Sequence, residues 1–169
     1  PLTPTFSLPA GRYDSSQTLR LSVADSSATI FYTLNGRLPT PETAITYTNP
    51  IPFSSITPQT VSLRSRLRWP DGTLGPAQTH SYFLGLPETL PLLALTLDPD
   101  DFDALHTNYT ERGRDWERPV DAVYHDPRNQ AGCTTPAGLR IHGRISRAEA
   151  KQSFRLYFRS EYGQSQLTY

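Results

Sequence analysis

One lysine stands out among the residues that could do chemistry. Lys151 is the only lysine in 169 residues, and the other fifteen basic residues are arginines. A bias of the coding sequence toward arginine codons would also leave lysine rare. An ammonium is a compact charge with rotatable donors, which suits contact with phosphate oxygens. Gly143, Ser146 and Arg147 precede it, so a glycine-bearing loop and a lysine stand close together, a combination that favours phosphate binding.

The elements that would position these residues are two strands. Residues 137–142 and 153–159 are rich in β-branched and aromatic side chains, and Gly143 lies between them as a hinge. Period-two alternation places Lys151 on the same face as the arginines of the second strand. The opposite face of that strand is expected to enter a core through Phe154, Leu156 and Phe158.

The whole chain has the pattern of a mainly β protein in two regions. Alternating strands are predicted in the first region, residues 1–84, which is expected to form an immunoglobulin-like β-sandwich. Residues 85–91 are typical of a linker. Residues 92–169 are expected to form a second β-rich unit, with a short helix that begins at Asp98 as N-cap. The predicted strands are 18–23, 28–33, 60–69, 78–84, 92–97, 120–125, 137–142 and 153–159.

Composition excludes several classes of partner. The formal net charge is +0, so neither nucleic acid nor an anionic membrane is favoured. No apolar run is long enough to cross a bilayer. The single cysteine, Cys133, forms no intrachain disulfide, as in a cytosolic protein or a bridge-free bacterial extracellular one. The absence of methionine suggests a processed product or an excerpt.

The first region carries motifs of a known domain. Pro4-Thr5-Phe6-Ser7, Gly11-Arg12-Tyr13, the stretch from Tyr32 to Thr40, and Tyr47-Thr48-Asn49-Pro50-Ile51 resemble the chitobiase/β-hexosaminidase C-terminal-type domain over about residues 3–84. Asn35 stands where this family more often has Asp. The resemblance implies either a surface glycan ligand or a spacer in which Tyr32, Tyr47 and Trp69 are core aromatics.

The second region carries longer motifs. The segments Asp98-Pro99-Asp100, 108-NYTERGRDWERPV-120, 138-GLRIHGRISR-147 and 151-KQSFRLYFRSEYG-163 resemble the amino-terminal part of the CotH family of atypical protein kinases, over about residues 90–169. Gln152 replaces a second lysine of the family pattern. The pair Arg144-Ile145 is bulkier than usual, which bears on how closely the loop approaches phosphate.

This resemblance implies an incomplete kinase-like N-lobe and transfer of an ATP phosphate to Ser or Thr hydroxyls of extracytoplasmic proteins. ATP and Mg²⁺ or Mn²⁺ are expected for the complete protein. Lys151, Arg147, Ser146 and Gly143 are then the nucleotide-binding candidates. No catalytic or metal-binding residue is assigned, because the family's catalytic Asp lies in a C-lobe beyond this segment. We therefore expect the fragment alone to be inactive.

Several alternatives remain open at this stage. The rival class is a non-catalytic surface-structural or carbohydrate-adhesive module at the cell surface. Trp116 to Pro119 is interpreted as a strand-entry turn with a Glu117–Arg118 surface pair. The acidic run from Asp98 to Asp103 lacks the rest of a calcium loop. Residues 90–169 are expected to expose an apolar face, which the missing C-terminal part would cover, and to self-associate without it.

Overall fold

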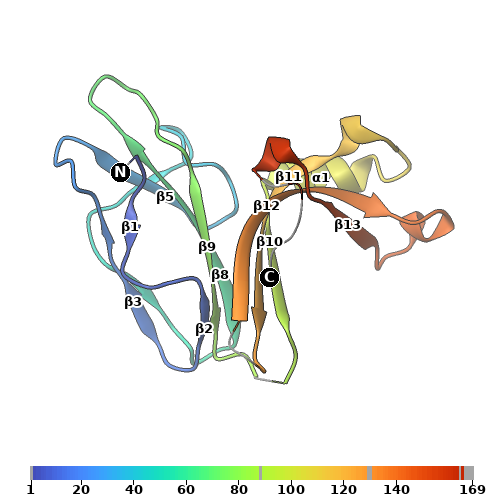
Figure 1. Cartoon of the computed structure of the whole chain (residues 1–169), viewed down its shortest axis with the longest axis horizontal. Coiled ribbons are helices and arrows are strands. Elements are labelled where there is room, and N and C mark those ends of the chain that lie inside the picture. Colours follow the sequence, from blue (N-terminus) through green and yellow to red (C-terminus); the bar gives the residue numbers. More distant parts are fainter. Residues whose placement is uncertain (1, 88, 129–130, 164, 166–169) are drawn as a thin grey trace.

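The computed structural model describes residues 2–87, 89–128, 131–163 and 165 of the chain. Within these residues the fold is mainly β, with one α-helix and three 3₁₀ turns (Figure 1). Glu88 of the predicted linker and the last residues of the predicted second unit lie outside the described residues. The first-region strands are β1 Thr5–Phe6, β2 Gly11–Tyr13, β3 Gln17–Leu19, β4 Leu21–Ser22, β5 Thr29–Thr33, β6 Ile45–Thr46, β7 Ile51–Phe53, β8 Gln59–Arg68 and β9 Gln78–Leu84.

The first region, called the sandwich here, contains a five-stranded sheet and two small strand pairs. The order of the large sheet is β2-β9-β8-β5-β6, and β1 pairs with β4 and β3 with β7. The core between them is apolar because the strands alternate, so that Leu63 and Leu67 of β8 are fully buried. Leu19, Phe53 and Tyr82 from other strands complete it. This arrangement is consistent with the predicted β-sandwich.

The second region, called the distal unit here, is a four-stranded antiparallel sheet. Its elements are β10 Leu92–Thr96, α1 Pro99–Thr107, η1 Arg114–Trp116, β11 Arg118–Asp126, β12 Ala131–His142, η2 Ile145–Ala148, β13 Ser153–Tyr157 and η3 Ser160–Tyr162. The strand order is β10-β11-β12-β13. The kinase-like character of this unit stays a prediction, since a small sheet with one helix is common to many folds.

Helix α1 begins as the sequence predicts. The Asp98 side chain accepts a hydrogen bond from the Asp100 backbone N–H, and Pro99 occupies the first turn. The helix packs Leu105 onto the sheet, where it meets Val120 and Leu139. Because that contact covers one end of the sheet face, α1 fixes the position of the segment that follows it.

That sheet face is only partly covered by α1. Phe154 was expected in the core but is 38% exposed, and Leu93 of the apolar run is 52% exposed. Both lie on edge strands, so each has a neighbouring strand on one side only. An apolar cavity of about 210 Å³ lies between Leu93, Leu156 and Phe158. Leu93 and Phe154 are therefore exposed apolar side chains, and a continuous apolar face that a further segment would cover stays a prediction. Self-association stays a prediction, which sedimentation velocity over a concentration series checks.

The outer face of β8 departs from the expected pattern. Arg64 alternates with Leu63 along β8, so period two predicts it on the solvent face, yet it is only 6% exposed. The reason is that the distal unit packs against this face. The Arg64 guanidinium donates to the backbone oxygens of Gly36 at 2.8 Å and Thr96 at 3.0 Å, and to Asp121 Oδ2 at 2.8 Å. The sandwich and the distal unit are thus joined by a buried arginine.

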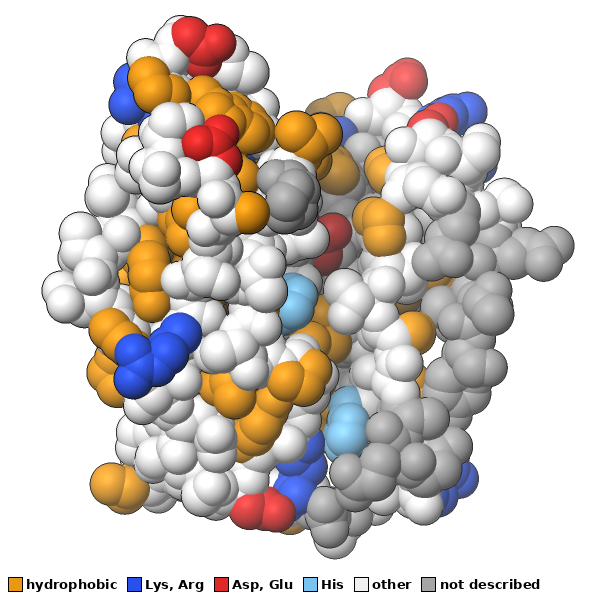
Figure 2. Space-filling view, turned by 60° about the vertical axis from the view of Figure 1, so that its left-hand side comes forward, with side chains coloured by type: hydrophobic (Ala, Val, Ile, Leu, Met, Phe, Trp, Pro, Cys, Tyr) orange, Lys and Arg blue, Asp and Glu red, His pale blue; other side chains and the backbone are white. Residues whose placement is uncertain are grey.

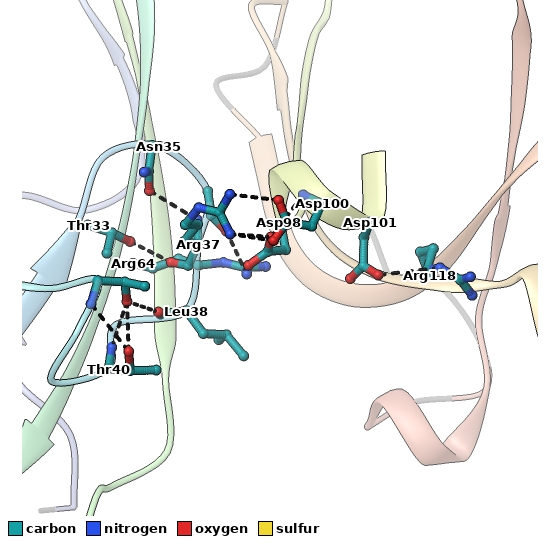
Figure 3. A network of polar contacts seen from close by, with 12 residues as sticks. Thr33, Asn35, Arg37, Leu38, Thr40, Arg64, Asp98, Asp100, Asp101 and Arg118 are labelled. Carbon is teal, nitrogen blue, oxygen red and sulfur yellow. Dashed lines mark hydrogen bonds and ion pairs between the residues drawn. The ribbon is translucent and has the colours of Figure 1, made fainter. Parts of the chain in front are cut away.

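A second polar contact joins the same two units beside α1 (Figure 3). Arg37 follows the Asn35-Gly36 turn and donates two hydrogen bonds of 2.7 Å to the Asp100 carboxylate. It also lies 3.3 Å from Asp98 Oδ1, so it contacts the helix N-cap. Hydrogen bonds from Arg37 lower the pKa of Asp100. The turn that resembles the chitobiase-type motif therefore contacts the start of α1.

An apolar contact and a cavity complete the interface between the units. Phe83 of β9 packs against Ala94 and Val123 of the distal sheet. Next to this contact, His80 and His125 line a cavity of about 360 Å³, and the hollow between the units in Figure 2 contains histidine side chains. Burial lowers the pKa of His80. The predicted linker joins two units whose sheets pack against each other face to face.

Candidate functional site

The predicted phosphate loop lies between two paired strands. Strands β12 and β13 are antiparallel, with His142 opposite Ser153. Gly143 has φ 117°, a left-handed value that favours glycine. A Cβ on Gly143 would meet the Ser146 hydroxyl, so a larger residue would also require that side chain to move. The strand, glycine hinge, loop and returning strand expected from the sequence are confirmed.

Arg147 stabilises this loop from inside. It is 9% exposed, and its guanidinium donates to the backbone oxygens of Tyr109 at 2.5 Å, of Ile141 at 2.7 Å, and of Glu111. Its own backbone oxygen accepts a 2.7 Å hydrogen bond from Gln152 Nε2. Arg147 therefore ties the loop to the segment after α1.

Lys151 lies in the same loop but in a different environment. It is exposed, it precedes β13 rather than belonging to it, and it is not among the residues that line the neighbouring cavity. The expected strand face that runs from Lys151 to Arg159 is therefore shorter, because β13 comprises only Ser153–Tyr157. The role of Lys151 toward a nucleotide stays a prediction.

The cavity beside the loop is lined by four arginines, of which the sequence analysis selected only Arg147. Its volume is about 260 Å³, and it lies between the segment after α1, the end of β12, the loop and β13. Trp116 and Gly143 form part of its wall. The arginines that line it are Arg112, Arg140, Arg147 and Arg155. Such a lining attracts anions, because guanidinium groups bind phosphate and carboxylate oxygens.

Aromatic and acidic neighbours hold Arg140 at the edge of this cavity. Its guanidinium carbon lies 4.0 Å from the centre of the Tyr157 ring, and Arg159 lies 5.1 Å from the same ring. The nearest carboxylate oxygen, Glu117 Oε2, is 3.6 Å from Arg140 Nε. That distance is too long for a hydrogen bond, and Arg140 Nε is buried without a hydrogen-bond partner among the described residues.

Glu117 corrects an expectation drawn from the sequence. It was predicted to form a surface pair with Arg118, but its side chain is 1% exposed and accepts hydrogen bonds from Arg159 Nε at 2.8 Å and Nη2 at 3.0 Å. Tyr162 Oη donates to it at 3.1 Å. Burial alone would raise the pKa of Glu117, but these hydrogen bonds and the nearby arginines lower it. Glu117, which directly precedes β11, thus connects the start of that strand to the turn η3.

The aromatic candidates of the sandwich are half-buried. Tyr32 and Tyr47 pack edge to face at 6.4 Å, and both contact the sandwich core, as does Trp69. Burial raises the pKa of Tyr32. These contacts give the three rings a packing role, and the glycan-binding alternative stays a prediction.

Two further properties concern metals and membranes. Among the described residues, no group of three or more His, Cys, Asp or Glu side chains is placed to hold a metal ion. The described helices include none with the length and apolar character needed to span a membrane.

Comparison with known proteins identifies part of the sandwich. Residues 8–66 match the family model of the chitobiase/beta-hexosaminidase C-terminal domain. This match supports the resemblance stated from the sequence for the first region. No curated protein and no solved structure matches the chain. The resemblance of the second region to the CotH family is therefore a proposal.

Proposed function

We propose that the chain is part of a CotH-like atypical protein kinase, which transfers an ATP phosphate to Ser or Thr hydroxyls of extracytoplasmic or coat proteins. The observation that carries the proposal is the glycine-hinged loop between β12 and β13, with an arginine-lined cavity beside it. Loop N–H groups and cations are the groups that contact phosphates in kinase-like sites. Gly143, Ser146, Arg147 and Lys151 are the proposed nucleotide-binding residues.

The residues of this site fit ATP better than a divalent metal ion. Guanidinium and backbone donors match the phosphate oxygens of ATP. The described residues offer no set of carboxylates for Mg²⁺ or Mn²⁺, so we assign no metal ligand to this chain. The catalytic acid–base group is likewise not assigned here. Phosphoryl transfer is proposed for the parent protein, with the missing C-terminal part as partner and with an extracellular or cell-surface location.

The alternative is a non-catalytic surface-structural or carbohydrate-adhesive module. The family match over residues 8–66 favours it, because the named domain accompanies proteins that act on sugars. In that case the sandwich would present a surface glycan site, and the distal unit would serve as its support. The two functions differ in whether the protein binds ATP through the loop.

A nucleotide titration tests the kinase proposal. We expect Lys151→Ala to weaken ATP binding in the presence of Mg²⁺ by about five- to ten-fold, because an exposed ammonium is partly screened by salt. Isothermal titration calorimetry measures the Kd. Arg20→Ala removes an exposed cation of the sandwich and is the matched control. An ATP affinity that is unchanged in Lys151→Ala, or the absence of saturable ATP binding, would contradict the proposal.

A further inference from the structure

The cavity beside the loop holds more positive charge than its neighbours neutralise. Within the described part of the chain, Arg112, Arg147 and Arg155 form no ion pair with a carboxylate. Glu111 supplies the single carboxylate among the described lining residues. Arg140 has Glu117 at 3.6 Å, but Arg159 holds that carboxylate more closely. The cavity is therefore electropositive, and its walls concentrate that field.

The charges around the cavity are fixed in place by contacts within the protein. Arg147 uses its guanidinium on backbone oxygens and cannot move away from the cavity. The Tyr157 ring stacks on Arg140, whose buried Nε has no hydrogen-bond partner among the described residues. Arg155 Nη2 lies 3.2 Å from His142 Nε2. These contacts hold the guanidinium groups around the cavity.

The lining also shows repulsion between its own cations. Burial lowers the pKa of Arg147, and the charges of Arg112 and Arg140 lower it further. Like charges that are held together by backbone contacts are relieved when an anion enters between them. A guanidinium presents planar forked donors, so arginines from several segments suit a tetrahedral oxyanion, whose oxygens point in several directions.

We propose that this cavity binds the phosphate end of a small phosphorylated molecule through Arg112, Arg140 and Arg155. A doubly charged phosphate matches the excess of positive charge better than a singly charged carboxylate does. The volume of about 260 Å³ leaves room for a second phosphate or part of the attached molecule. The proposal goes beyond phosphoryl transfer, because it requires neither ATP nor Lys151.

Pyrophosphate is the probe that tests this site. We expect saturable binding to the protein, with Arg112→Gln and Arg155→Gln each weakening it by about five- to ten-fold. Both side chains are exposed enough for the variants to fold, and circular dichroism verifies this. Arg144→Gln is the matched control, since Arg144 follows Gly143 but is exposed and does not line the cavity. Trp116 lines the cavity, so its fluorescence in a Trp69→Phe background gives a second readout.

The outcomes separate this proposal from the proposed kinase. Pyrophosphate binding that is lost in the two cavity variants but kept in Lys151→Ala supports the cavity even if ATP binding fails. ADP binding that is tighter than pyrophosphate binding identifies a nucleotide as the source of the phosphate. Equal affinities for wild type, Arg112→Gln and Arg155→Gln would overturn the proposal. A loss in Lys151→Ala as large as in Arg155→Gln would place the anion on the loop and also overturn it.

Discussion

Replacing Arg64 by alanine is expected to lower the free energy of unfolding by about 3–5 kcal/mol. The reason is that the substitution removes the cation from a buried site that joins the two units. Among the described residues, the Asp121 carboxylate would keep the Thr79 hydroxyl, which donates to it at 2.5 Å. The backbone oxygens of Gly36 and Thr96 would also lose their arginine donor. In a chain of this size the midpoint of thermal unfolding would fall by about 6–20 °C.

Arg66→Ala is the matched control for this experiment. Arg66 lies on the same strand and the same face as Arg64, but its hydrogen bonds to the described residues stay within the sandwich, at Gly75 O (2.9 Å) and Pro39 O (3.4 Å). We expect it to lower the free energy of unfolding by about 1 kcal/mol. Differential scanning calorimetry measures both variants. If Arg64→Ala is no more destabilised than Arg66→Ala, the contact between the units contributes little.

The shape of the transition carries further information. The apolar contact at Phe83, together with the Arg64 and Arg37 contacts, should make the sandwich and the distal unit unfold together. Loss of Arg64 weakens this coupling, so two separate transitions are expected in place of one. This matters for function, because a fixed sandwich would define where the distal unit stands relative to a surface glycan or a coat protein.

Much of the fold follows from local alternation. The strand at residues 78–84 was predicted with its observed bounds, and 60–69 differs from β8 by one residue at each end. The helix start at Asp98 also follows from local chemistry. Period two places one face of each strand inward. Period two does not say what covers the outward face of a strand. The prediction of Arg64 on the solvent face is wrong for this reason, because the sheet that covers it begins at Leu92, far along the chain.

The candidate site was predictable only in part, for a related reason. The loop around Gly143 and Ser146 could be identified because its residues are adjacent in sequence. The cavity lining could not, because Arg112 enters it from the segment after α1 and Arg155 from the returning strand. Arginine is abundant in this chain, so no single arginine differs from the others by type. Lysine does differ, because Lys151 is the single lysine of the chain, but the structure places it outside the cavity.

A double-mutant cycle at Gly138 and Glu117 has the second large expected effect. Gly138 lies in β12, where it pairs with Tyr157, and it is buried. A Cβ on Gly138 would lie 2.3 Å from Glu117 Oε1 and 2.5 Å from its Cγ. Glu117 cannot move aside, because Arg159 and Tyr162 hold its carboxylate. We therefore expect Gly138→Ala to lower the free energy of unfolding by about 2–3 kcal/mol.

The same methyl group should be tolerated when Glu117 is absent. Glu117→Ala is itself destabilising, because Arg159 and Tyr162 lose their common acceptor. In that background Gly138→Ala is expected to cost less than about 0.5 kcal/mol, since the vacated space accepts the methyl group. Chemical denaturation of the four proteins gives the coupling between the two positions, expected at about 1.5–3 kcal/mol.

Gly132→Ala provides a contrasting glycine on the same strand. Its Cβ would meet the backbone oxygen of Tyr124 at 2.6 Å rather than Glu117, so its cost should be the same with and without Glu117. If the Gly138→Ala cost does not depend on Glu117, the carboxylate does not occupy that space. Glu117 would then not hold η3 against the sheet, and the anchoring of Arg140 beside the cavity would rest on Tyr157 alone.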